Sequence, residues 1–188
     1  CNILIFQTCK YTCIYTIIIS ELERLKVGRY HFIAIGGIGM SGLAKYLLED
    51  GHTVSGSDIA DSKYIDKLRE LGAQVKIGHN EANLSDDTDI VVISTAIREN
   101  NPELVKARQL SIPVYHRSDL LEEIAKTAQQ SGKCFIGFSG THGKTTTSGL
   151  ASFVLDKAGL EPSFVDGGII PDINTCLLYT SPSPRDLS

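Results

Sequence analysis

Short apolar runs and longer amphipathic segments alternate along residues 29–128. Runs rich in β-branched or aromatic side chains predict strands, whereas segments with apolar positions three or four residues apart predict helices. The strands predicted in this way are 31–35, 53–56, 74–77, 89–94 and 112–115. Strands that alternate with single helices are typical of an open parallel sheet with right-handed crossovers, so we predict an α/β fold.

Helix-terminating residues stand where this periodicity places the helix ends. Gly51 and Gly72 follow two predicted helices, at the position where glycine adopts the left-handed backbone. Ser62 is expected to cap one helix, and Asn101, followed by proline, to open the next. Ser118 is expected to cap a further helix that runs to residue 129.

The strand–helix pattern restarts after a polar junction, where we place a domain boundary within residues 127–133. Residues 134–138 predict a buried strand, a loop rich in glycine and threonine follows, and residues 148–158 predict a helix. One more strand is predicted at 163–165. Because these elements are too few to close a sheet, we expect residues 129–175 to be the truncated start of a second α/β domain.

The two ends of the chain differ from its body. Residues 1–20 contain neither glycine nor an acidic residue, and Lys10 interrupts their apolar run, which makes them a poor membrane span. Residues 176–188 are rich in serine and proline and show no periodicity. We expect residues 1–28 to be a non-native leader and residues 176–188 a non-native tail. The alternative for the first segment is a real strand or anchor.

Residues 138–147, Phe-Ser-Gly-Thr-His-Gly-Lys-Thr-Thr-Thr, carry the clearest chemistry. A strand, a glycine loop with lysine and then a helix form the layout of a nucleoside triphosphate site, because loop N–H groups and the helix N-terminus face the phosphates. Lys144 can reach the β- and γ-phosphate oxygens, and the hydroxyl of Thr145 can bind Mg²⁺. The usual pattern has glycine where this chain has Phe138. The alternative is a surface turn with a solvated lysine.

A second glycine loop lies about a hundred residues upstream. Gly37, Gly39 and Gly42 follow a predicted strand and open a helix, and Asp58 ends the next strand. This spacing is the dinucleotide-binding fingerprint and predicts a Rossmann-like domain over residues 29–128. A glycine loop at a helix N-terminus accepts a diphosphate from any nucleotide, so a UDP-linked ligand fits as well as NAD. A tight turn without a ligand is the remaining interpretation.

The two loops together narrow the function. A nicotinamide-dependent oxidoreductase or NAD sensor leaves the second loop idle, and a P-loop kinase or ATPase switch leaves the first one idle. A protein that joins a nucleotide-linked substrate to ATP chemistry uses both.

The net charge of −4 implies no basic face for nucleic acid. Five cysteines without metal-ligand spacing favour a reducing compartment and no structural zinc, so we expect a cytoplasmic protein without a membrane partner.

Four stretches resemble the Mur ligases: residues 31–42, residues 55–58, residues 94–97 with 101–103, and residues 140–147. The likeness runs from about residue 29 to about residue 174. It is greatest to the branch that adds L-alanine to UDP-N-acetylmuramate in peptidoglycan synthesis, with the branch that recycles murein tripeptide second. The family shares Gly-Thr-x-Gly-Lys-Thr, which accounts for the missing first glycine of the ATP loop.

The resemblance implies a role for each loop. It assigns contacts with the UDP-linked substrate to Gly36, Gly37, Ile38, Gly39, Met40, Ser41, Asp58, Ser94, Thr95 and Ala96. It assigns ATP binding to Gly140, Thr141, His142, Gly143, Lys144, Thr145 and Thr146. Lys144 and Thr145 are the implied catalytic residues, the latter through Mg²⁺. His79 is a weaker substrate-side candidate, with a solvated loop histidine as the alternative. Asp166 precedes a glycine pair near the family's active site, where a loop aspartate is the simpler interpretation.

The implied reaction is ATP-driven amide formation by an acid–amino-acid ligase. The substrate carboxylate attacks the γ-phosphorus to give an acyl phosphate, and the amine of L-alanine then displaces phosphate. Lys144 and Mg²⁺ stabilise the charge on the transferred group. In the family, further metal ligands and a third domain correspond to positions beyond residue 175. We therefore expect the chain alone to be an inactive fragment.

Overall fold

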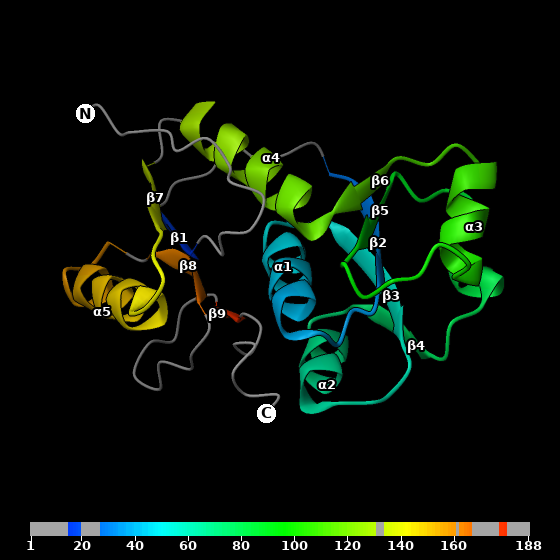
Figure 1. The fold of residues 1–188 in the computed structure, drawn as a ribbon, viewed down its shortest axis with the longest axis horizontal. Helices are drawn as coiled ribbons and strands as arrows, with labels where there is room; N and C mark the ends of the chain where they lie inside the picture. The colour runs from blue at the N-terminus through cyan, green and yellow to red at the C-terminus, as the bar shows by residue number, and fades with distance from the viewer. Residues whose placement is uncertain (1–14, 20–26, 131–133, 161, 167–176, 180–188) are drawn as a thin grey trace.

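The computed structural model describes residues 15–19, 27–130, 134–160, 162–166 and 177–179 of the 188-residue chain. Its strands form two sheets, with helices packed around each (Figure 1). The larger sheet and four of the helices come from the part of the chain in which the sequence predicts a parallel α/β domain. The smaller sheet and the last helix carry the ATP-type loop.

The larger sheet is parallel throughout. It consists of β2 (Arg29–Ile33), β3 (Thr53–Asp58), β4 (Gln74–Ile77), β5 (Ile90–Ile93) and β6 (Val114–His116). The strand order is β4-β3-β2-β5-β6, which confirms the predicted open sheet. The direction of strand addition reverses between β2 and β5, so the ends of these two strands flank a topological switch point, where open α/β sheets bind ligands.

Helices cover both faces of this sheet (Figure 1). On one face lie α1 (Ile38–Glu49), α2 (Lys63–Glu70) and α4 (Arg117–Gln130), and on the other lie α3 (Pro102–Gln109) and the short 3₁₀ helix η1 (Glu81–Asn83). Each face has its own apolar core. The first core gathers Phe32, Ile35, Met40, Leu43, Leu47, Val54, Ile65, Leu68, Val92, Leu120 and Ile124, and the second gathers Ile33, Leu84, Val91, Leu104, Ala107 and Ile112.

Most predicted helix ends are confirmed. Ser62 Oγ accepts a hydrogen bond from Ile65 N, and Asn101 Oδ1 accepts from two N–H groups of the first turn of α3. Gly51 and Gly72 have φ angles of 88° and 99°, the left-handed values expected after a helix.

The predicted cap at Ser118 is wrong, because α4 begins at Arg117 and Ser118 lies within it. The side chain of Asp119 binds the backbone before the helix instead, because Asp119 Oδ2 accepts a hydrogen bond from His116 N at 3.0 Å. The Ser118 hydroxyl contacts the His116 ring. A short polar side chain just before an apolar run therefore identified the helix start to within two residues, but not the capping group.

The smaller sheet has the order β7-β1-β8-β9. Its strands are β7 (Cys134–Phe138), β1 (Tyr15–Ile19), β8 (Ser163–Asp166) and β9 (Leu177–Tyr179), and β1 runs antiparallel to both β7 and β8. The helix α5 (Lys144–Lys157) starts four residues before the predicted position, directly after the glycine loop. The non-native origin expected for residues 1–28 and 176–188 stays a prediction, although β1 and β9 lie within those segments.

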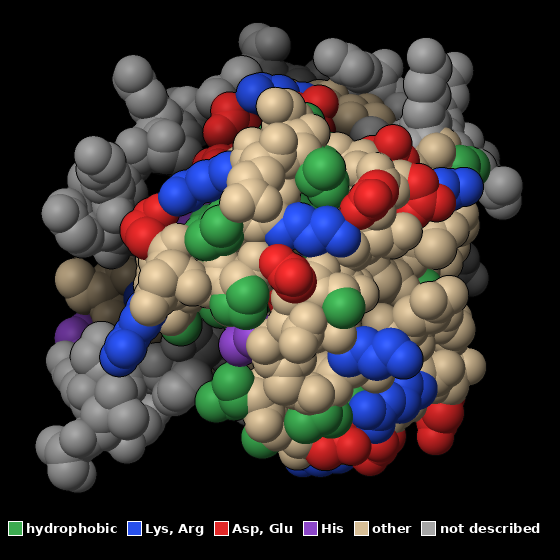
Figure 2. Space-filling view, turned by 90° about the vertical axis from the view of Figure 1, so that its right-hand side faces the viewer, with side chains coloured by type: hydrophobic (Ala, Val, Ile, Leu, Met, Phe, Trp, Pro, Cys, Tyr) green, Lys and Arg blue, Asp and Glu red, His purple; other side chains and the backbone are tan. Residues whose placement is uncertain are grey.

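The face that lies over α3 carries acidic, basic and hydrophobic side chains interspersed with one another (Figure 2). A groove of about 310 Å³ between η1 and α3 is lined by Glu81, Ala82, Asp86, Lys106, Gln109 and Leu110 and contains no predicted site residue. Among the described residues, none of the helices combines the length and the apolar character that crossing a bilayer requires.

Candidate functional site

The first glycine loop lies at the carboxyl end of β2, beside the switch point. The chain leaves the strand through Ala34, whose φ of 65° is unusual for a residue other than glycine. Gly37 is the N-cap residue of α1, and no side chain caps the helix there. The first turn of α1 contains no acidic residue either. Its free N–H groups and positive dipole end are therefore available to an anion.

Asp58 closes this loop from the neighbouring strand. Its Oδ2 accepts a hydrogen bond from Gly36 N at 2.8 Å, and its Oδ1 accepts from Ala60 N at 3.3 Å. A Cβ atom at Gly36 would lie 2.9 Å from Ile65 Cδ1 and 3.0 Å from Asp58 Oδ2, so a larger residue here would force these side chains to shift. In this structure Asp58 orders the glycine loop, and its predicted contact with the uridine stays a prediction.

The predicted UDP-contacting residues differ in what they can offer a ligand. Met40 is buried and packs in the first core, so its side chain faces away from solvent. Ser41 uses its N–H for Gly37 O and its hydroxyl for Ile38 O at 3.0 Å, both within the first turn of α1. Any contact from Met40 must therefore come from the backbone, and Ser41 would have to exchange an existing hydrogen bond.

Ser94, Thr95 and Ala96 leave the carboxyl end of β5 on the other side of the switch point. They form a turn in which Ile97 N donates to Ser94 O at 3.1 Å, and Thr95 and Ala96 are exposed. Phe32 pairs with Val92 in the sheet, so this turn and the Ala34 turn leave adjacent strands at the same level. The structure thus brings together the two segments that sequence reasoning placed around one ligand.

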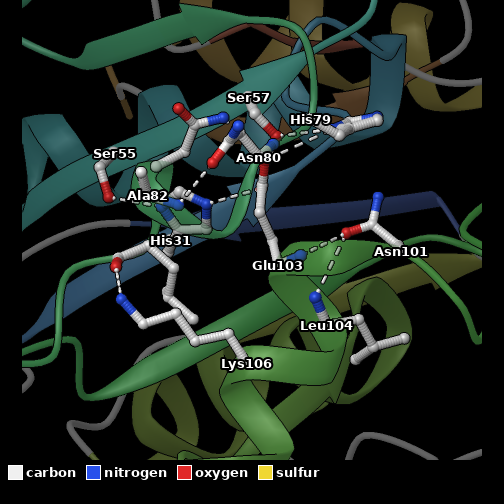
Figure 3. Close-up of polar contacts among 12 residues, drawn as sticks. His31, Ser55, Ser57, His79, Asn80, Ala82, Asn101, Glu103, Leu104 and Lys106 are labelled. Carbon is white, nitrogen blue, oxygen red and sulfur yellow. Dashed lines mark hydrogen bonds and ion pairs between the residues drawn. The ribbon is translucent and has the colours of Figure 1, made fainter.

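A buried polar network underlies this edge of the sheet, and sequence reasoning did not identify it (Figure 3). Its centre is Glu103, in the first turn of α3, whose side chain has no exposed surface. Oε2 accepts from Ser57 Oγ at 2.6 Å and lies 3.0 Å from His31 Nε2. Oε1 accepts from Asn80 N at 3.0 Å and from Asn83 Nδ2 at 2.9 Å.

The carboxylate of Glu103 stays charged in this setting. Burial alone would raise the pKa of Glu103, but the hydrogen bonds from His31, Ser57, Asn83 and Asn80 N outweigh burial and lower that pKa from 4.5 to about 2. The N-terminal end of α3 also favours a negative charge. A buried carboxylate with all of these donors is stable as an anion, whereas loss of one donor or of the charge leaves buried polar groups unpaired.

His79 connects the network to the edge of the site. Its Nδ1 lies 2.8 Å from Ser57 Oγ and 3.6 Å from Glu103 Oε1, and 18% of its side chain is exposed. The preceding residue, Gly78, donates its N–H to Asp58 O at 2.7 Å. His79 is therefore anchored beside Asp58, and the interpretation as a freely solvated loop histidine is wrong.

The second glycine loop precedes α5 on the smaller sheet. Gly143 is the N-cap residue with a φ of 75°, no side chain caps the helix, and its first turn contains no acidic residue. Lys144 Nζ donates to Gly140 O at 2.6 Å, and the His142 ring contacts the Thr141 hydroxyl. By contrast, α2 and α3 have side-chain caps and an acidic residue in the first turn. Of these four helices, the two that follow glycine loops have N-termini that are free to bind an anion.

The described residues include no cluster of three or more His, Cys, Asp or Glu side chains that could hold a metal ion. Thr145 is half-buried at the start of α5, where a hydroxyl can ligate Mg²⁺ only together with phosphate oxygens. Asp166 is the last residue of β8, and the glycine pair that follows it lies outside the described residues.

A parallel sheet with a glycine loop at its switch point, and a second glycine loop that carries a lysine, are typical of nucleotide-binding α/β proteins. The family described as Mur ligase family, catalytic domain, matches residues 29–129. The chain belongs to the Mur ligase family.

Relatives within the family share much of this chain. The UDP-N-acetylmuramate–L-alanine ligase of Carboxydothermus hydrogenoformans is 47% identical over 159 residues, which are 85% of this chain and 33% of that protein. The enzyme of the same name from Rhizobium meliloti is 47% identical over 144 residues, 77% of this chain and 29% of that protein. The chain therefore spans about a third of the length of the curated relatives it matches.

Two solved structures share the fold. The crystal structure of UDP-N-acetylmuramate–alanine ligase from Thermotoga maritima matches with a TM-score of 0.66 and 30% identity, over 81% of this chain and 36% of that one. A UDP-N-acetylmuramate:L-alanyl-γ-D-glutamyl-meso-diaminopimelate ligase from Neisseria matches with a TM-score of 0.66 and 28% identity, over 85% of this chain and 49% of that one. The two TM-scores are equal, so the fold does not separate these two enzymes, while both curated relatives named above bear the alanine ligase name.

Proposed function

We propose that this chain supplies the UDP-substrate domain and the ATP phosphate loop of a ligase that joins L-alanine to UDP-N-acetylmuramate. The observation that carries this proposal is the pair of glycine loops at uncapped, acid-free helix N-termini, one of them at the switch point of a parallel sheet. Relatives at 47% identity with the alanine ligase name support the choice of substrate.

In this proposal the residues around Gly36 bind the UDP-linked acid. The free N–H groups at the start of α1 face the diphosphate, and the turn with Ser94, Thr95 and Ala96 contacts the ligand from across the switch point. Asp58 keeps the loop in the conformation that exposes those N–H groups, because it holds Gly36 N. The first loop would thereby hold the UDP part of the substrate.

The second loop fits a Mg²⁺-bound triphosphate, which supplies the phosphoryl group that activates the substrate carboxylate as an acyl phosphate. The N–H groups of Lys144, Thr145 and Thr146 form the first turn of α5 and bind phosphate oxygens. Lys144 must exchange its contact with Gly140 O for the β- and γ-oxygens, where its charge stabilises phosphoryl transfer. Thr145 contributes its hydroxyl to Mg²⁺.

Calorimetry with two variants tests this assignment of loops. Gly36→Ala introduces the overlaps with Ile65 and Asp58, so we expect it to weaken UDP-N-acetylmuramate binding by at least about tenfold and to leave ATP binding unchanged. Lys144→Met should show the opposite pattern. Tight NAD binding without UDP-N-acetylmuramate binding to the unmodified chain would refute the proposal in favour of a Rossmann oxidoreductase or sensor.

The recycling ligase remains the second candidate, because one structural neighbour with a TM-score of 0.66 is named for a tripeptide substrate. Both names contain UDP-N-acetylmuramate, so binding of this ligand does not separate them. Phosphate release by the full-length ligase that contains this chain separates the two. Turnover with L-alanine, and none with L-alanyl-γ-D-glutamyl-meso-diaminopimelate, is the result that our proposal requires.

A further inference from the structure

We propose that Glu103 and Ser57 fix the ring of His79 in the form protonated on Nδ1, so that His79 Nε2 accepts a hydrogen bond from the nucleoside of the bound UDP-linked substrate. Glu103 and Ser57 are then positioning residues that act through His79. The inference rests on the proposed function for the identity of the ligand, whereas the protonation of the ring follows from the contacts of the chain itself.

The charge of Glu103 decides which atoms around it donate hydrogen bonds and which accept them. An ionised carboxylate only accepts hydrogen bonds. The single hydroxyl proton of Ser57 therefore points at Glu103 Oε2, 2.6 Å away. With that proton committed, Ser57 Oγ can only accept from the ring of His79, whose Nδ1 lies 2.8 Å away. His79 Nδ1 must then carry a proton, and in the neutral imidazole Nε2 is left as an acceptor.

The network holds this arrangement rigidly. Asn80 N, directly after His79 in the chain, donates to Glu103 Oε1 at 3.0 Å. Gly78, directly before it, donates its N–H to Asp58 O. His79 is thus tied on both sides by backbone hydrogen bonds and through its ring by Ser57. Since the carboxylate has no exposed surface, bulk water does not compete with Ser57 for it.

His79 lies at the edge of the sheet where the ligand is expected. His79 follows β4 and lies beside Asp58, at the carboxyl ends of the parallel strands. The ring is partly exposed, and its Nε2 makes no hydrogen bond to the described part of the chain. An acceptor at this position repels a diphosphate oxygen but suits a ribose hydroxyl or a base N–H. The nucleoside end of the ligand is therefore its partner.

Nitrogen-15 spectra of the histidine rings in the ligand-free 188-residue chain test the positioning. In the neutral ring we expect the proton of His79 on Nδ1 and not on Nε2, and a shift toward a mixture of tautomers in Ser57→Ala. Glu103→Gln should produce the same shift. If Glu103→Gln does not fold, Ser57→Ala alone still tests the proposal. Ser118→Ala is the matched control, because it removes the hydroxyl from the separate His116–Ser118 pair. A His79 proton on Nε2, or a tautomer unchanged in Ser57→Ala, overturns the proposal.

Calorimetry with UDP, its 2′-deoxy and 3′-deoxy forms, and N3-methyl-UDP tests the acceptor role. His79→Ala should weaken UDP binding by about fivefold, as expected for the loss of one hydrogen bond, and Ser57→Ala by a smaller factor. One of these analogues lacks the group that donates to His79 Nε2. That analogue should bind the unmodified chain more weakly than UDP does. It should bind His79→Ala as tightly as UDP binds that variant. If His79→Ala binds UDP with an affinity within a factor of about 1.5 of that of the unmodified chain, the acceptor role is refuted.

The two experiments separate this inference from the proposed function. If the unmodified chain binds neither UDP nor UDP-N-acetylmuramate, the proposed function is refuted and the nucleoside contact with it. The ring spectra of the ligand-free chain still decide whether Glu103 and Ser57 set the protonation of His79.

Discussion

Acidification should lower the folding stability of the chain because Glu103 becomes protonated. The Glu103→Gln variant should not show this loss. The pKa of Glu103 is lowered from 4.5 to about 2 in the folded protein. A carboxyl group with a depressed folded pKa stabilises the protein above its unfolded pKa, and this contribution is lost as the pH falls toward the folded value. The loss should therefore occur between about pH 5 and pH 2.

The size of the effect follows from the shift. A difference of about 2.5 pKa units, at about 1.4 kcal/mol per unit, corresponds to roughly 3 kcal/mol of folding free energy. Glutamine has no charge to lose, and its amide group faces donors that the carboxylate satisfied. Glu103→Gln should consequently be less stable than the unmodified chain at pH 7 by a few kcal/mol, and this difference should shrink by about 3 kcal/mol as the pH approaches 2.

Urea denaturation at a series of pH values, followed by far-ultraviolet circular dichroism, measures this difference directly. Taking the difference between two variants cancels the titration of the other acidic groups. The control is Glu99→Gln, because Glu99 is exposed and pairs with Arg108 on the surface. Its stability should follow that of the unmodified chain within about 0.5 kcal/mol at every pH. If the free energies of unfolding of Glu103→Gln and of the unmodified chain change with pH in parallel, the hydrogen bonds to Glu103 do not lower its pKa as described.

Three further changes test the local structure, each by urea denaturation at neutral pH. Asn101→Ala removes the cap that accepts from two N–H groups of α3, and should cost about 1–2 kcal/mol; a cost below 0.3 kcal/mol would contradict the cap. Ala34→Gly relieves a φ of 65° and should stabilise the protein by about 0.5–1 kcal/mol, whereas destabilisation would show that Ala34 is unstrained. Ile65→Ala removes a fully buried side chain and should cost about 2–5 kcal/mol, while the half-exposed Leu71→Ala serves as the comparison and should cost under half as much.

The parallel sheet could be predicted from sequence because its signals are local. The apolar periodicity, the caps at Ser62 and Asn101 and the glycine at position 51 each act within one turn of a helix or one strand. The start of α4 was misplaced because two polar residues compete there, and Asp119 rather than Ser118 holds the preceding backbone. The start of α5 was placed four residues late because threonine and lysine alone do not indicate a helix.

The glycine loops were also recognisable, but the network beneath them was not. Glu103 meets His31 across 72 residues of sequence and Ser57 across 46, and no local pattern encodes such pairings. One signal was present in the sequence. His31, Ser55 and Ser57 occupy positions in strands that helices cover on both faces, where a polar side chain needs a buried partner. Glu103, in the first turn of a helix, could have been suspected as that partner.

The place of Glu103 in the chain has a consequence for how the edge of the sheet at the carboxyl ends of β2 and β5 is maintained. The carboxylate belongs to the segment after the crossover, while its donors all come from the segment before it. Its hydrogen bonds therefore hold α3 against the β2–β3–β4 half of the sheet, and this edge is ordered before any ligand binds. A ligand that binds at an ordered edge spends little of its binding free energy on ordering the protein, and more of that energy remains as affinity.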